Sequence, residues 1–398
     1  MPGGPFEKRN HPPAWYNALR DMMLLALAFP SLDGIGKIVV FLVMLSVLVV
    51  LHEYGHFMLA RWNGVRVNDF AFGFGPTLLK WTSPRSGTNY RVNAFPVGGY
   101  CAMQGEDGRT SEAAQQRDFL EHAAGGSDNF QSKTPWQRLA IVAAGPIANF
   151  VVALVILIFG AMLFGAATDK ISTCVGPLTA DSPGARAGLH IGDCIASIDG
   201  VPMRSGEQMV ARIHGSSGAP LRVGVLRHGQ ALDFTIVPAV GVQDGKKVRI
   251  IGFQTQPVYK QVNPIGAIAF GTESFARLMV LNAVGLGGLF IHPHSALAQV
   301  SGPIGMARVS SEAQDLGPGP YLQLAAAISV ALGIFNFLPI PALDGGRGIF
   351  IIAEMLRGRP VDPEKEALVH VTGFALLMML MVFVAYHDIA NIVSSKPL

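Results

Sequence analysis

Residues 38–59 read IVVFLVMLSVLVVLHEYGHFML, an apolar run that ends in ionisable side chains. The hydrocarbon core of a bilayer is roughly 30 Å thick, and a helix needs about 20 mostly apolar residues to cross it. Ionisable groups at membrane depth are costly, so they usually serve a function there. The stretch therefore predicts a first membrane span that carries His52, Glu53 and His56 near its end.

The composition of the whole chain also indicates a membrane protein. Of its 398 residues, 50% are hydrophobic and only 14% are charged, whereas a soluble domain has about 25% charged residues. The net charge of +3 is small, and no cluster of Lys and Arg alternates with aromatic residues. We therefore exclude nucleic acid as a partner and expect a multi-pass α-helical protein surrounded by membrane lipids.

Four apolar windows are long enough, or nearly so, to cross a bilayer. They lie at about 38–59, 139–165, 322–343 and 368–386. A fifth apolar stretch, 265–291, contains Glu273 and Arg277, which lie four residues apart and can pair on one helix face. We expect this stretch to lie on the membrane surface, in a helical linker of residues 259–320, with a further crossing as the alternative.

The spans divide the chain into unequal loops. Lys and Arg are denser in residues 60–138 than in residues 166–321, so the positive-inside rule places 60–138 in the cytoplasm. With four spans, the segment 166–321 and both termini then lie outside. A first half of the membrane core would cover 35–165 and a second half 321–398, with residues 1–34 as an N-terminal extension.

The outer segment has the pattern of a folded domain. Within 171–258, short apolar runs alternate with turn residues, as in SPGARAGL at 182–189 and HIGDCIASIDG at 190–200. The order of these strings resembles a bacterial PDZ domain, an α/β fold that binds extended peptides by strand addition. Cys174 and Cys194 can pair in an oxidising compartment, but we expect isolated buried thiols.

HEYGH, His52 to His56, has the H-E-x-x-H pattern of zinc peptidases. On a helix, residues i and i+4 lie on one face, so both imidazoles can bind one Zn²⁺ while Glu53 reaches a water molecule. A catalytic zinc takes three protein ligands. The best candidate for the third is Asp344 in NFLPIPALDGG, residues 336–346, where two prolines end the third span.

Three motifs in this order resemble the site-2 protease family of intramembrane zinc metalloproteases, and in particular the bacterial sigma-E-regulating branch that cleaves anti-sigma factors. They are HEYGH in the first span, G-P-x-x-N in the second (Gly145 to Asn149) and N-x-x-P-x-P-x-L-D-G in the third (Asn336 to Gly345). The resemblance implies one Zn²⁺ bound by His52, His56 and Asp344, with Glu53 as general base. It also implies an inner-membrane location and cleavage within a transmembrane helix of a single-pass substrate, which another protease can cut first.

Further strings fit the same family. RVNAFPVGGYCAMQGED, residues 91–107, resembles the membrane-associated β-hairpin that presents substrate in relatives, within a loop of about 66–107; Gly98 and Gly99 supply its bend. Asn336 is a candidate oxyanion or substrate donor. Asn149 and Gly145 suit close helix packing first and substrate contact second. Relatives with two PDZ domains differ from this chain, which has room for one.

Two other classes of function stay open at this level. A non-catalytic PDZ scaffold with a structural metal would require a fourth protein ligand, and no Cys or His is placed to supply it. A zinc transporter would require ionisable residues on several spans, and the second and fourth are nearly bare of them. The sequence predicts neither the oligomeric state nor the role of residues 1–34.

Overall fold

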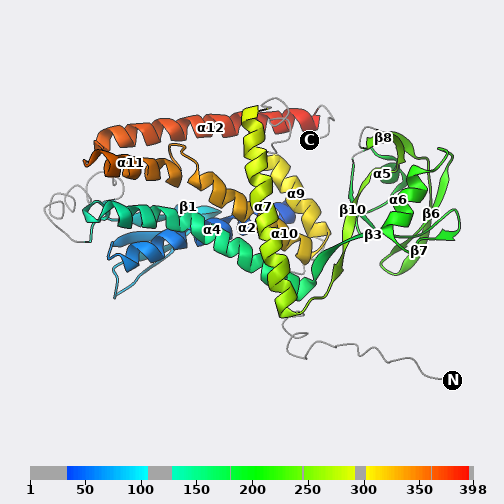
Figure 1. Cartoon of the computed structure of the whole chain (residues 1–398), viewed down its shortest axis with the longest axis horizontal. Helices are drawn as coiled ribbons and strands as arrows, with labels where there is room; N and C mark the ends of the chain where they lie inside the picture. The colour runs from blue at the N-terminus through cyan, green and yellow to red at the C-terminus, as the bar shows by residue number, and fades with distance from the viewer. Residues whose placement is uncertain are drawn as a thin grey trace, which may run out of the picture.

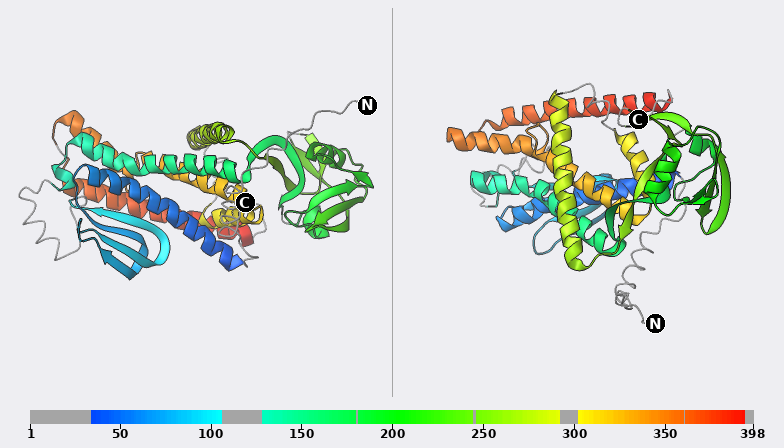
Figure 2. Two further views of the ribbon diagram at one scale, coloured as in Figure 1. Left: turned by 90° about the horizontal axis from the view of Figure 1, so that it is seen from below. Right: turned by 45° about the vertical axis from the view of Figure 1, so that its right-hand side comes forward.

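The computed structural model describes residues 34–105, 128–179, 181–243, 246–291, 302–359 and 361–393. The predicted N-terminal extension lies outside these ranges except for Gly34. The described chain forms a bundle of long helices with a small β-sheet against one end and an α/β domain beyond the other (Figures 1 and 2). The bundle therefore separates two β-containing parts that the sequence places between its spans.

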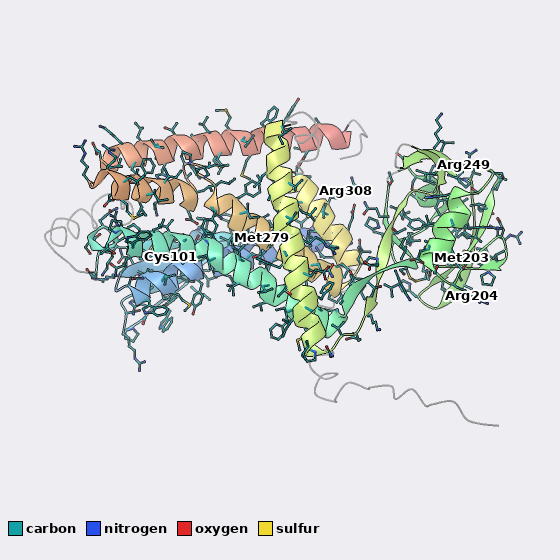
Figure 3. All side chains as sticks on the ribbon, in the orientation of Figure 1. Cys101, Met203, Arg204, Arg249, Met279 and Arg308 are labelled. Carbon is teal, nitrogen blue, oxygen red and sulfur yellow. A yellow bond between two sulfur atoms is a disulfide. The ribbon has the colours of Figure 1, made fainter. Side chains whose placement is uncertain are left out.

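Four long helices correspond to the four predicted spans. They are α2 (Gly34–Trp62), α4 (Pro135–Phe164), α10 (Pro318–Phe337) and α12 (Pro363–Val393). By length and hydropathy, five helices in the described part of the chain qualify for crossing a membrane, and α7 (Pro264–Ile291) is the fifth through Gly288. Figures 1 and 3 show α7 crossing over α4 and α10 rather than running along them, with Met279 at the crossing.

Successive helices of the bundle alternate in direction. Gly319, at the start of α10, packs on Phe164 at the end of α4, and Gly333 packs on Phe150. The start of α10 also meets the start of α2, where the Tyr321 hydroxyl donates to Val40 O at 3.2 Å. Thus α2 and α10 run one way and α4 the other, so the end of α2, the start of α4 and the end of α10 lie together.

Local sequence signals explain where α4 begins and where α10 ends. Thr134 and Gln137 form a capping box at the start of α4, and Pro135 occupies its first turn. Helix α10 ends at Phe337, so the predicted span to residue 343 was too long. The reason is the pair Pro339 and Pro341, which cannot donate the helical hydrogen bond. The chain then resumes as a short helix, α11 (Asp344–Arg357), which the sequence analysis did not predict.

The segment between α2 and α4 forms one sheet from two long, bent strands. Strand β1 (Val67–Thr82) and strand β2 (Asn89–Met103) pair twice, because Phe70 faces both Cys101 and Tyr90. The resulting order across the sheet is 99–103, 67–72, 89–93 and 77–82. Gly73, Gly75 and Gly98, all with positive φ, bend the two strands. Residues 77–82 are therefore one edge of this sheet.

The α/β domain lies between α4 and α7. Its main sheet has the order β10-β3-β4-β6-β7, with β5 beside β4, and β8 pairs with β9 separately. The strands are β3 (Ala166–Leu178), β4 (Cys194–Ile198), β5 (Val201–Pro202), β6 (Leu221–Arg227), β7 (Gln230–Ile236), β8 (Ala239–Gln243), β9 (Lys246–Ile250) and β10 (Phe253–Lys260). Two helices, α5 (Pro183–Ala187) and α6 (Gly206–His214), cover it. The sheet extends beyond the predicted 171–258 at both ends.

The expectation of isolated thiols was wrong for two of the three cysteines. Cys174 and Cys194 are directly opposite each other in β3 and β4, and a disulfide joins them. Their separation of 20 residues gave no local signal for this; the pairing of the two strands brings them together. Cys101 is a buried thiol outside the disulfide, as expected.

The linker predicted at 259–320 contains two helices, α7 and α9 (Pro303–Asp315). Residues 292–301 lie outside the described ranges. Helix α7 packs on the bundle through Phe275, Leu278 and Met279, which contact the buried Ala153, Leu157, Ala326 and Val330 of α4 and α10. Its outward face remains apolar and exposed, as at Val280, Leu281 and Val284.

Candidate metal centre

His52 and His56 lie on one face of α2, turned toward α4, and both side chains are buried. Their Nε2 atoms face each other at 3.2 Å. Asp344, the first residue of α11, brings its Oδ2 to 3.0 Å from His52 Nε2 and 3.4 Å from His56 Nε2. The structure thus brings the three predicted ligands together from segments almost three hundred residues apart.

The arrangement of these three atoms fits a tetrahedral cation. Ligand atoms bound to Zn²⁺ at 2.0–2.1 Å in a tetrahedron are about 3.3–3.4 Å apart, close to the separations of 3.0, 3.2 and 3.4 Å found here. Asp344 Oδ2 is also buried without a hydrogen bond of good geometry. The three residues therefore form a site suited to a divalent metal.

Gly145 of α4 forms the wall of the site. A Cβ on Gly145 would lie 2.2 Å from His56 Nε2 and 2.7 Å from His52 Nε2. Across the same contact, a Cβ on Gly55 would lie 2.3 Å from Ala144 O. The two glycines let α2 and α4 approach closely enough for the ligand atoms to meet α4 directly. The sequence analysis assigned Gly145 to helix packing, and its position against the ligand atoms is the more specific finding.

The other ring nitrogens of the histidines have partners on α4. His56 Nδ1 lies 2.8 Å from Ile141 O, so it must carry the proton that it donates. This leaves Nε2 with its lone pair free for a metal, the usual arrangement for metal-binding histidines. The sequence analysis missed Ile141, because its main-chain carbonyl makes the contact and a residue of any type carries that group.

Asn149 contacts His52. Its amide lies 3.1 Å from His52 Nδ1, and its own Oδ1 is buried without a partner. A half-turn of the amide would exchange Oδ1 and Nδ2 and place the acceptor opposite a protonated Nδ1. Asn149 was predicted to have a structural or a substrate-contacting role. The structure instead places it where it orients a metal ligand.

Glu53 lies beside the ligand face of α2. It is half-buried, and its charge acts on His56. At 3.6 residues per turn, Glu53 projects between the histidine face and the face that contacts the sheet. On the latter, the Ser46 hydroxyl donates to Pro96 O and Phe57 packs on Phe70 at a ring-centroid distance of 5.3 Å. The carboxylate is thus positioned between the metal ligands and the sheet.

The remaining predicted residues do not join this cluster. Asn336 donates to Leu332 O of its own helix at 3.0 Å, a contact that satisfies the amide locally. Gly98 and Gly99 lie in the sheet, where a Cβ on Gly98 would meet Phe74 and one on Gly99 would lie 3.0 Å from Val50 of α2. Gly99 therefore fits the sheet to α2 at Val50, two residues before His52, whereas Gly98 makes room for Phe74 within the sheet.

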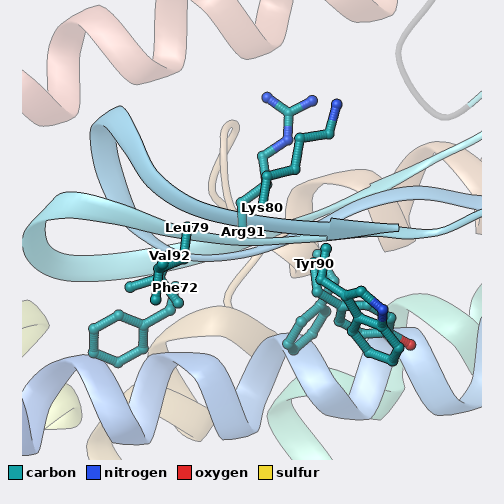
Figure 4. A pocket seen from close by; sticks show the side chains of 8 residues that line it. Phe72, Leu79, Lys80, Tyr90, Arg91 and Val92 are labelled. Carbon is teal, nitrogen blue, oxygen red and sulfur yellow. The ribbon is translucent and has the colours of Figure 1, made fainter. Parts of the chain in front are cut away.

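A pocket of about 440 Å³ opens on the sheet. Its lining consists of Phe70, Phe72, Leu79, Lys80, Trp81, Tyr90, Arg91 and Val92. Figure 4 shows Phe72 and Tyr90 pointing toward the underlying helix while Lys80 and Arg91 point to the opposite side. The sheet therefore presents an aromatic, apolar face on the side of α2, while Lys80 and Arg91, the latter paired with Asp69 at 2.7 Å, lie on the other side.

Comparison with known proteins agrees with this site. A model described as peptidase family M50 matches residues 40–380. A putative zinc metalloprotease of Rhizobium meliloti is 35% identical over 364 residues, covering 88% of this chain and 95% of that protein. The regulator of sigma-W protease RasP of Bacillus subtilis is 30% identical over 426 residues, with coverages of 90% and 99%.

Among solved structures, the PDZ domain of an SdrC-like protein from Listeria innocua matches with 24% identity and a TM-score of 0.19, covering 21% of this chain and 92% of that domain. The family match includes all three metal ligands and nearly all of the bundle. The resemblance to site-2 proteases is confirmed, and Zn²⁺ is the cofactor that the relatives' names and the three ligands support. The chain belongs to peptidase family M50 and is a zinc metalloprotease.

Proposed function

We propose that this chain hydrolyses a peptide bond within or near the transmembrane segment of single-pass membrane proteins. One observation carries the proposal: the three ligands and Glu53 lie on helices long and apolar enough to cross a membrane, or directly after one. A peptidase built there meets a membrane-embedded substrate more readily than a soluble one.

The residues of the site have distinct roles in this reaction. His52, His56 and Asp344 would hold Zn²⁺, which supplies Lewis acidity toward the scissile carbonyl and makes water a stronger acid. Glu53, beside the ligand face, accepts the proton of the attacking water and then gives it to the leaving amine. Asn149 and Ile141 O fix the two imidazoles through their Nδ1 atoms.

A helical substrate hides its amides in internal hydrogen bonds, so it must unwind before hydrolysis. The edge 77–82 of the sheet supports this step, because an edge strand offers unpaired main-chain groups for strand addition. Leu78, Leu79 and Trp81 on that edge are exposed and apolar, which suits a transmembrane sequence. At the start of the string 91–107, which resembles the substrate-presenting hairpin of relatives, Arg91 and Val92 already have strands on both sides.

We extend the proposal to the orientation of the chain in the membrane. The sheet and metal centre lie at the end of the bundle where α2 ends and α4 begins, and we assign that end to the cytoplasm. The PDZ-like domain follows the opposite end of α4, and we assign it to the periplasm. Its Cys174–Cys194 disulfide supports an oxidising compartment. With α7 lying across the bundle at the membrane, four spans satisfy this assignment.

The substrate class is the most specific part of the proposal. The Bacillus relative is named a regulator of sigma-W protease, and we extend from that name to a regulatory, single-pass protein such as an anti-sigma factor. The PDZ-like domain would select such substrates outside the membrane, before or after a first cut by another protease.

The test compares the parent chain with Glu53→Gln during co-expression with candidate single-pass proteins. The amide retains the shape of the side chain but cannot accept the proton, so we expect intact substrate to accumulate and cleavage to fall by about 10²–10⁴-fold. Bound zinc, measured after purification, should stay at the parent level. Glu273→Gln is the matched control, because Glu273 is an exposed residue on α7. Equal cleavage by the parent and Glu53→Gln would refute the proposal.

A further inference from the structure

The loop between α10 and α11 carries Asp344 into the metal centre. Within this loop Ala342 has φ of 78°, a left-handed backbone that a residue with a Cβ rarely adopts. Ala342 lies just after Pro341, whose ring already restricts the chain. Such a strained position two residues before a metal ligand persists only when neighbouring groups hold it in place.

We infer that His370 of α12 is a positioning residue for the metal centre, because it accepts a hydrogen bond from the Ala342 N–H and so fixes the loop that orients Asp344. The distance from Ala342 N to His370 Nδ1 is 2.9 Å. The inference rests on the metal site described above and deepens it. This hydrogen bond joins His370 to the main chain of the loop, two residues before Asp344.

The side chain of His370 is itself held in one orientation. Its ring packs against Phe350 of α11 at a centroid distance of 5.6 Å. Its Nε2 lies 3.9 Å from Glu366 Oε1, one turn earlier on α12. Because Nδ1 accepts from an amide, the proton of a neutral ring lies on Nε2, on the side of that carboxylate. The imidazole therefore presents Nδ1 to the loop as a hydrogen-bond acceptor.

The loop is enclosed on both sides. On the side of α11, a Cβ on Gly345 would lie 2.2 Å from Leu338 O, and one on Gly346 would lie 2.3 Å from Ile340 O. On the side of α12, a Cβ on Gly373 would lie 2.3 Å from the Cβ of Pro341. Close packing on two sides leaves the Ala342 N–H directed at α12, where His370 satisfies it.

The rest of α12 touches the bundle little. Among the residues of α12 whose burial is described, only Gly373 and Asp388 are buried. Gly373 is the contact with Pro341, and Asp388 accepts from the Gly305 amide of α9 at 3.1 Å. The loop before Asp344 is thus one of two places that fix α12. A change in the position of α12 would reach the metal through His370.

The experiment measures the zinc dissociation constant of the purified full-length chain by competition with a chelator. His370→Leu introduces an apolar side chain of similar bulk and removes the hydrogen-bond acceptor. We expect zinc binding to be about 10-fold weaker, the effect typical of residues that orient metal ligands. His370→Asn places an amide oxygen near the position of Nδ1 and should bind zinc about as tightly as the parent.

A second pair of variants separates positioning from general stability. Ala342→Gly removes the penalty of the left-handed backbone, so Ala342→Gly combined with His370→Leu should bind zinc more tightly than His370→Leu alone. Thr372→Val is the matched control, because Thr372 bonds to Leu368 O within its own helix at 2.8 Å. It should leave zinc affinity unchanged.

Melting of the chain after zinc removal completes the test. A merely structural His370 would lower the melting temperature of the zinc-free chain and leave the dissociation constant as in the parent. Parent-like zinc binding by His370→Leu, or equal loss in His370→Leu and His370→Asn, would overturn the inference. Neither result bears on Glu53→Gln, so the proposed proteolysis stands or falls separately.

Discussion

The metal centre and the PDZ-like domain both bury ionisable groups, but they satisfy them in different ways. In the domain, Asp193 is 1% exposed, and Arg227 binds both of its carboxylate oxygens at 2.7 Å. In the bundle, the imidazoles of His52 and His56 face the carboxylate of Asp344 with no cationic side chain among them. The first arrangement is complete within the protein, whereas the second requires an added cation.

This difference separates folding from metal binding. The domain has its own apolar core, which includes Ile195, Ile198, Met209, Val223 and Ile236. Its buried charge pair needs nothing from outside, so the domain should be indifferent to zinc. The bundle brings Gly145 and three ligands together around a site that only a metal completes. Changes at one region should therefore leave the other unaffected, and the following predictions test that separation.

The largest effect is expected from His56→Ala. Removing one of three ligands should weaken zinc binding by more than the roughly 10–100-fold typical of outer partners and abolish cleavage. Zinc content after purification and cleavage of a single-pass reporter measure both. His190→Ala is the control, an exposed histidine in the PDZ-like domain. If the two variants lost zinc equally, the metal would not be bound where we place it.

Gly145→Ala should have the next largest effect. Alanine ordinarily favours a helix over glycine by about 1 kcal/mol, yet here the added Cβ would lie 2.2 Å from His56 Nε2. We expect zinc affinity to fall by at least about 10-fold. Gly160→Ala in the same helix provides the comparison, since its Cβ would meet nothing closer than Leu322 at 3.9 Å. Parent-like zinc affinity in Gly145→Ala would contradict the close approach of α4 to the ligands.

Asp193→Asn should act only on the PDZ-like domain. Breaking a buried charge pair costs about 3 kcal/mol, so amides of β4 and β6 should exchange hydrogen roughly 100-fold faster. The zinc dissociation constant should not change. Asp233→Asn, an exposed site on β7, serves as control. Loss of zinc in Asp193→Asn would show that the two regions are coupled after all.

The smallest effect concerns pH. Burial alone would raise the pKa of Asp193, but hydrogen bonds from Arg227 and from the His190 amide lower it below its ordinary value. The charge pair therefore stabilises the domain fully above about pH 4, the usual carboxyl pKa, and this stability is lost as the pH falls through the lower pKa of the folded state. As the pH is lowered, the protection of β4 amides, corrected for intrinsic exchange, should decrease more in the parent than in Asp193→Asn.

The bundle was the more predictable part from sequence. Apolar length identified the four helices of the core, and the spacing of His52 and His56 placed both on one helix face. The errors were at the ends: the span predicted to reach residue 343 stops at Phe337, because Pro339 and Pro341 outweigh apolarity there. For α7, length and hydropathy qualify it for crossing, and it packs on α4 and α10; its surface position stays a prediction.

The contacts beyond the motif were less predictable. The disulfide of Cys174 and Cys194 arises from the register of β3 and β4. Phe70 pairs with both Cys101 and Tyr90 because β1 and β2 bend at matching positions. Asn149 is within reach of His52 only because Gly55 and Gly145 let their helices meet. None of these contacts has a short-range pattern, so only their common position in space reveals them.

By itself the sequence determined which segments are long and apolar enough to cross a membrane, and that two imidazoles and a carboxylate end such segments. These features are local: they depend on chain length and on the helical period of 3.6 residues. The tertiary structure decided that Asp344 meets the histidines, that Asn149 and Ile141 O orient them, and that His370 holds the loop before Asp344. Those contacts join residues from 28 to almost three hundred positions apart, and close packing of helices, not spacing along the chain, sets them.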